Sequence, residues 1–118
     1  MNKVLIIGSR YWTDEGRIYS FLAQQPKGTQ LIHGGGAGAE ALAKKVTKDR
    51  GMKEKEFKSD VKKHGRAAVA VRNHEMLTKG KPDLVAYFHN NLSKNQATAN
   101  LISEARGLGV SVVNGARS

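Results

Sequence analysis

The stretch Leu31–Glu40, which reads LIHGGGAGAE, decides the expected fold of this chain. It places four glycines between a short apolar run and a segment of helix-forming residues. Glycine adopts backbone angles that other residues avoid and leaves space for close approach. A glycine turn that enters a helix exposes unpaired backbone N–H groups at the positive end of the helix dipole, where anions such as phosphates bind. The stretch therefore predicts a strand, a phosphate-binding turn and a helix.

Apolar runs and helical patterns alternate on both sides of this stretch. Strands are expected at 4–7, 31–32, 52–57, 84–88 and 110–113. Helices are expected at 14–25, 39–50, 65–79 and 93–108, the last one starting at a capping box in 93–96. Charges alternate in 52–57, which indicates an edge strand. Strands separated by helices need right-handed crossovers, so we expect an α/β fold: a single Rossmann-like three-layer domain over 1–118, with an open, five-stranded, mainly parallel sheet.

The composition argues against several classes of protein, namely membrane-spanning, disulfide-bonded and metal-binding ones. No apolar stretch approaches the roughly 20 residues that span a bilayer, so no membrane partner is expected. The chain has no cysteine, which excludes disulfides and thiolate metal sites and favours a cytoplasmic location. The four histidines lack ligand spacing: His74–Glu75 begins like the H-E-x-x-H motif, but Thr78 stands where the second histidine belongs. We therefore expect neither a metal site nor a cofactor.

The charge is strongly basic, with 20 Lys or Arg against 10 Asp or Glu. Residues 44–81 hold thirteen of the basic and five of the acidic residues. Such a field attracts polyanions, although a charged run is equally typical of a solvated surface. Lysines outnumber arginines there, and acidic residues interrupt them, which argues against a dedicated DNA groove.

Polar residues or glycines follow the apolar runs at Gly8–Arg10, His33–Gly35, 57–59 and His89–Asn90. In open parallel sheets, ligands bind beyond the carboxyl ends of the strands, so these groups are expected at one edge. The planar guanidinium of Arg10 suits a phosphate. Tyr11 and Trp12 either stack on a base or cover the first helix.

Several motifs resemble one known family, in the same order along the chain. They are Gly8–Arg10, His33–Glu40, His64–Ala68 with Arg72, Asn73 and Met76, and Lys81–Val85. Together they resemble the YspA, or YpsA-related, branch of the SLOG superfamily, over nearly the whole of 3–113. The LOG phosphoribohydrolases and the DNA-binding protein DprA belong to the same superfamily.

The resemblance implies a Rossmann-like sheet and a pocket for a nucleotide or a nucleotide-derived molecule, lined by the loop Gly34–Gly38. It does not imply one activity. LOG members cleave the N-glycosidic bond of nucleoside 5′-monophosphates, DprA members bind single-stranded DNA, and others are considered sensors of nucleotide signals. Members of this branch occur in bacteria and phages, and relatives commonly self-associate, which implies a homo-oligomer.

One departure from the family pattern concerns catalysis. LOG enzymes carry P-G-G-x-G-T-x-x-E after the fourth strand, whereas residues 89–101 read HNNLSKNQATANL. Thr98 keeps the place of the threonine, but the glycines are absent and neither Asn100 nor Leu101 supplies the carboxylate. Because glycosidic hydrolysis passes through an oxocarbenium-like state that a carboxylate stabilises, its loss favours binding over catalysis. Glu40 and Glu104 remain as catalytic candidates.

Each candidate residue has a structural alternative. Arg66 and Arg72 match family positions. Each of them either binds a ligand or forms an ion pair. Asn73 either hydrogen-bonds a ligand hydroxyl or caps a helix. Glu40 either hydrogen-bonds a ribose or complements the helix dipole. His33 lines the pocket or holds the glycine turn by a backbone hydrogen bond. The ligand-binding candidates are Gly8, Ser9, Arg10, Tyr11, His33, Gly34, Gly35, Gly36, Ala37, Gly38, Glu40, Arg66, Arg72, Asn73 and Thr98.

Three functions stay open on the sequence. The first is binding of a nucleotide or nucleotide-derived small molecule by a sensor, carrier or sequestering protein. The second is N-glycosidic cleavage of a nucleoside monophosphate. The third is DprA-like binding of single-stranded nucleic acid through the basic segment 44–81.

Overall fold

The strand β1 organises the fold, because its apolar run Val4–Ile7 is buried on both faces of the sheet. The computed structural model describes residues 2–117. The strands are β1 (Lys3–Gly8), β2 (Gln30–His33), β3 (Lys53–Glu56), β4 (Leu84–Phe88) and β5 (Ser111–Asn114). They form one sheet in the order β3-β2-β1-β4-β5, and every pairing is parallel. In register, Val4 lies between Leu31 and Leu84.

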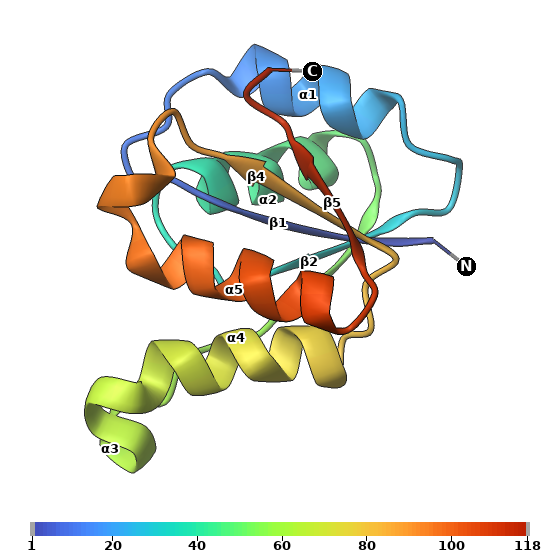
Figure 1. Cartoon of the computed structure of the whole chain (residues 1–118). Helices are drawn as coiled ribbons and strands as arrows, with labels where there is room; N and C mark the ends of the chain where they lie inside the picture. Colours follow the sequence, from blue (N-terminus) through green and yellow to red (C-terminus); the bar gives the residue numbers. More distant parts are fainter. Residues whose placement is uncertain (1, 118) are drawn as a thin grey trace.

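Helices cover both faces of the sheet (Figure 1). They are α1 (Glu15–Ala23), α2 (Ala39–Asp49), α3 (Val61–His64), α4 (Ala68–Thr78) and α5 (Gln96–Gly107), with 3₁₀ turns η1 (Gly65–Ala67) and η2 (Leu92–Lys94). The helices α1 and α2 pack on one face, and α4 and α5 on the other. Within the described residues, no helix is long and apolar enough to cross a bilayer. The parallel sheet with helices on both faces confirms the predicted strand–helix alternation and the Rossmann-like α/β class.

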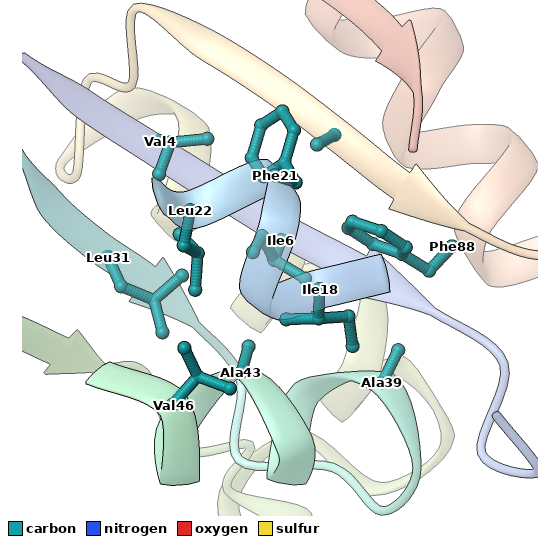
Figure 2. Packing of buried hydrophobic residues seen from close by; sticks show 11 residues of the cluster. Val4, Ile6, Ile18, Phe21, Leu22, Leu31, Ala39, Ala43, Val46 and Phe88 are labelled. Carbon is teal, nitrogen blue, oxygen red and sulfur yellow. The ribbon is translucent and has the colours of Figure 1, made fainter. Parts of the chain in front are cut away.

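The core on the α1–α2 face is built around the ring of Phe88 (Figure 2). The rings of Trp12 and Phe21 meet it edge-on, with centroid distances of 5.7 and 5.8 Å. Aromatic rings prefer this geometry because the positive edge of one meets the negative face of the other. Of the two roles considered for Trp12, its ring thus takes the structural one and packs on the core beside the first helix.

The predicted helix over 65–79 is wrong in its first turn. The short helix α3 precedes Gly65, η1 follows it, and only Ala68–Thr78 is continuous α-helix. Gly65 has a φ of +55°, in the left-handed region that ends a right-handed helix, and its N–H donates to Val61 O. The segment α3–η1 consequently projects from the body of the sheet (Figure 1).

The predicted start of α5 also needs correction. Ser93 lies in η2, and Asn95 is the N-cap, because its Oδ1 accepts the N–H of Thr98 at 3.0 Å. Both residues are polar and both stand before the same apolar pattern, so the spacing alone does not separate them. A side-chain acceptor at the N-cap satisfies one of the unpaired N–H groups of the first turn.

Asn95→Ala should lower the free energy of unfolding by about 1 kcal/mol, because it leaves the Thr98 N–H without its cap. Ser93→Ala is the matched control and should cost clearly less. Urea denaturation followed by circular dichroism measures both changes. Equal losses from the two variants would show that Asn95 is not the cap that matters.

Candidate functional site

The candidate site lies at the carboxyl edge of the sheet, where the loops after β1 and β2 meet. The N–H of Ala39, the first residue of α2, donates to Ser9 O at 3.0 Å. Ser9 N–H donates to Phe88 O at 2.9 Å, which continues the β1–β4 pairing. The three segments are thus joined by backbone hydrogen bonds, and Gly8, Ser9 and the loop Gly34–Gly38 come together as the topology predicts.

Gly34 is held from both faces of the sheet. Its N–H donates to Oε1 of Glu40, in the first turn of α2, at 2.8 Å. Its carbonyl accepts from Nη1 of Arg72, on α4, at 2.8 Å. A Cβ at position 34 would lie 2.0 Å from that Nη1 and 2.9 Å from that Oε1. The position is therefore glycine because two side chains of this chain occupy the space.

His33 fixes the next residue of the loop. The ring is fully buried, and its Nδ1 accepts the N–H of Gly35 at 3.0 Å. Because Nδ1 accepts, the ring proton sits on Nε2, which lies 2.9 Å from Oε2 of Glu54 on β3. His33 thus holds the turn, which is the structural alternative considered for it.

The sequence predicts unpaired N–H groups at this glycine turn, and the structure shows which of them lack an acceptor within the protein. The N–H groups of Gly34, Gly35 and Ala39 already have acceptors within the protein. In the described part of the chain, the N–H groups of 36–38 donate to no protein acceptor, and Gly35 and Ala37 are exposed. An anion would therefore find donors only in the second half of the loop.

Neighbouring atoms also lie close to the remaining glycines of the loop. A Cβ on Gly35, whose φ is +74°, would lie 2.5 Å from Oε2 of Glu56. On Gly36 it would lie 2.9 Å from Oε2 of Glu40. On Gly38, whose φ is +73°, it would meet the Ser9 carbonyl oxygen at 2.2 Å. Two carboxylates, Glu40 and Glu56, consequently flank the loop.

The residues after β1 extend from the loop into solvent. Arg10 and Tyr11 are exposed, with Tyr11 82% accessible, and the Arg10 guanidinium lies 5.7 Å from the Tyr11 ring centroid. The backbone of Arg10 lies against Gly38. The backbone that carries this cation and this aromatic ring thus passes beside the half of the loop that keeps its unpaired N–H groups.

Arg72 connects the loop to a cavity between α4 and α5. Its Nε donates to Oδ1 of Asn73 at 2.8 Å, and Asn73 is only 4% exposed. Asn73 and Arg66 line a cavity of about 260 Å³, together with Val69, Ala70, Ala97, Asn100, Leu101 and Glu104. A larger cavity of about 850 Å³ opens at the opposite, amino edge of the sheet, away from every candidate residue.

Two candidates, Thr98 and Glu104, lie on α5, apart from the loop. Thr98 is buried in the first turn of α5. Glu104, on the same helix, makes a short hydrogen bond to Nδ1 of His74. Glu40 and Glu104 lie on opposite faces of the sheet, because α2 covers one and α5 the other. They do not form a catalytic carboxylate pair. Within residues 2–117, no three His, Asp or Glu side chains are grouped to hold a metal ion.

Sequence reasoning missed the contribution of β3. Glu54 and Glu56 reach the loop because the β2–β3 register places His33 opposite Glu56. Lys44 Nζ donates to Oε1 of Glu56 at 3.0 Å. That hydrogen bond lowers the pKa of Glu56 and raises the pKa of Lys44. Only the alternating charges of β3, next to a strand that ends in histidine, could have signalled these contacts.

Comparisons with known proteins agree with this architecture. The profile of the YspA, cpYpsA-related SLOG family matches residues 2–64. Gene 61 protein of Mycobacterium phage D29 is 32% identical over 128 aligned positions, which cover 97% of this chain and 96% of that protein. The chain belongs to the YspA, cpYpsA-related SLOG family. The matched segment of this SLOG protein contains β1, the glycine loop, α2 and β3.

A solved structure supports the fold of this SLOG protein over nearly its whole length. The X-ray structure of TM1055, a structural genomics target, superposes with a TM-score of 0.68 and 19% sequence identity. The match covers 95% of this chain and 72% of the other. At that identity the likeness shows the fold alone.

Glu56→Gln should lower the stability of the SLOG protein at neutral pH by less than Asn95→Ala does, because the ion pair with Lys44 is partly exposed. The folded-state pKa of Glu56 lies below its ordinary value, so its contribution is present at neutral pH and fades as the pH falls through that folded pKa. The difference between wild type and variant should therefore shrink on acidification.

Urea midpoints measured from pH 7 to pH 3 give this difference directly. Glu75→Gln is the control, since its pair with Lys79 lies on the exposed side of the carboxyl end of α4. A Glu56→Gln difference that grew towards acid pH would contradict the assignment.

Proposed function

We propose that this SLOG protein binds a nucleotide or a nucleotide-derived small molecule at the carboxyl edge of its sheet, as a sensor, carrier or sequestering protein. The observation that carries the proposal is the gathering of unsatisfied polar groups around one loop. They are the N–H groups of 36–38, the exposed Arg10 guanidinium and the second carboxylate oxygen of Glu40. Ligands of open α/β sheets bind at this edge.

The parts of the proposed site differ in chemistry. The second half of the loop and Arg10 supply donors for an anionic group. The exposed ring of Tyr11 offers a stacking surface for a base. The cavity beside Asn73 and Arg66, which Arg72 joins to Gly34, supplies further room. One helix dipole contributes only about 0.3–1 kcal/mol to anion binding, so micromolar affinity requires these groups to act together.

Isothermal titration of a nucleotide panel, including nucleoside monophosphates, cyclic nucleotides and ADP-ribose-type molecules, should reveal binding by at least one member. Gly36→Val should weaken that binding roughly tenfold or more, because the side chain covers the loop N–H groups. The fold should tolerate it, since the nearest obstacle to a Cβ is the movable carboxylate of Glu40. Gly107→Val, at a site with no neighbour within 4 Å, is the matched control.

Absence of binding heat for every nucleotide of the panel at millimolar concentration would overturn the proposal. Equal weakening by Gly36→Val and Gly107→Val would place the ligand elsewhere on the protein.

A second candidate function is binding of single-stranded nucleic acid. The projecting segment around α3 carries Lys58, Lys62 and Lys63, all exposed. Among the described residues none of the three has an acidic partner within 4 Å, whereas Lys44 and Lys45 pair with Glu56 and Glu15. Unpaired lysines on a projection suit contact with a phosphate backbone.

If the SLOG protein binds an oligonucleotide through this projection, affinity should fall roughly 20-fold between 50 and 200 mM salt, as three phosphate contacts on a single strand require. Lys→Gln at 58, 62 and 63 together should remove most of that dependence. Lys27→Gln with Lys53→Gln, at the opposite edge, is the control. Fluorescence anisotropy measures both, and salt-independent affinity would contradict this mode of binding.

A further inference from the structure

Glu40 is an unusual neighbour for a phosphate-binding loop. The residue is 7% exposed, and only its Oε1 has a partner, the N–H of Gly34. No fully enclosed side-chain oxygen in the described part of the chain lacks a hydrogen bond, so the unpartnered Oε2 retains contact with solvent. Oε2 lies 2.9 Å from the place where a Gly36 Cβ would stand. A nearly buried carboxylate oxygen is therefore directed at the surface of the loop.

The charges around this half of the loop are predominantly negative. Glu40 has no cation within 4 Å among residues 2–117, Glu54 bonds His33, and Glu56 lies against Gly35. His33 carries no compensating charge, because its Nδ1 accepts the Gly35 N–H. Of the nearby cations, Lys44 pairs with Glu56, whereas Arg72 donates to two neutral oxygens, so the Arg72 guanidinium alone offsets the charges of Glu40 and Glu54. A free phosphate here would meet like charge.

The other half of the loop has the opposite character. The N–H groups of 36–38 are available there, and the backbone of Arg10 lies against Gly38. The loop thus has one end that accepts hydrogen bonds and one end that donates them. A ligand that satisfies both ends carries hydroxyl groups and an anionic group a short distance apart.

We propose, on the basis of the function proposed above, that Glu40 is a specificity-determining residue: its Oε2, beside Gly36, accepts a hydrogen bond from a ribose hydroxyl and excludes phosphate from that position. The anionic group of the ligand lies towards Gly38 and Arg10. The ligand class is accordingly a ribonucleotide with its 2′,3′-diol free, and inorganic pyrophosphate and dideoxynucleotides are poor ligands.

The test compares the tightest-binding ribonucleotide of the panel with its 2′,3′-dideoxy counterpart and with inorganic pyrophosphate, by isothermal titration. The wild-type chain should prefer the ribonucleotide to the dideoxynucleotide roughly tenfold or more, as a hydrogen bond to a charged group predicts. Glu40→Gln keeps an acceptor for Gly34 and removes the charge. It should reduce this preference towards unity and tighten pyrophosphate binding roughly tenfold.

Two further variants keep the test decisive. Glu56→Gln removes charge near Gly35 without touching Glu40, so it should tighten pyrophosphate binding and leave the diol preference intact. Glu75→Gln, on α4 and paired with Lys79, should change neither. Urea midpoints establish that each variant is folded.

The outcomes separate the two proposals. A ribonucleotide that binds with the same diol preference and the same pyrophosphate affinity in wild type and Glu40→Gln overturns the role of Glu40 and leaves the binding function standing. Absence of nucleotide binding in both chains overturns the proposed function and this inference with it.

Discussion

The fold at the carboxyl edge depends on the two hydrogen bonds that the N–H and the carbonyl of Gly34 make with side chains. One comes from a carboxylate on α2 and the other from a guanidinium on α4, so a single residue joins the helical layers on opposite faces of the sheet. Hydrogen bonds to charged groups contribute about 1.5–3 kcal/mol each, and removing one partner leaves the other group buried and unsatisfied. The path of the loop after β2 is therefore fixed by side chains from elements far away in the sequence.

These two hydrogen bonds of Gly34 change how the glycines of the loop are interpreted. A run of glycines before a helix suggests a cradle for a ligand, yet atoms of the chain itself already lie close beside each glycine from 34 to 36 and beside Gly38. What distinguishes this loop from a general anion site is the arrangement of charge around it. Glu40 and Glu56 stand beside its first half, and the Arg10 segment stands beside its second. Under the proposed function, that polarity determines selectivity as well as affinity.

Local patterns were sufficient for much of the fold. The apolar run of β1 predicted a central strand, and the alternating charges of β3 predicted an edge strand. The prediction failed where two local signals competed, as between Ser93 and Asn95, or where one glycine interrupted a helical composition, as at Gly65. The site depends more on contacts distant in sequence. Arg72 reaches Gly34 across 38 positions, and the carboxylates of β3 reach the loop only through the register of two strands.

The two edge strands of the sheet, β3 and β5, differ in how readily each would pair with the same strand of a second copy of the chain. Phe57 N–H donates to His33 O, so the backbone groups of Glu54 and Glu56 point outward from β3. Identical edges related by a two-fold axis pair antiparallel, and outward-facing residues then oppose outward-facing residues. Glutamate would lie opposite glutamate and lysine opposite lysine, which is destabilising. The edge of β5, with Val112, Val113 and Asn114, carries no charge to oppose such pairing. The same alternation that marks β3 as an edge strand therefore also disfavours its pairing with its own copy.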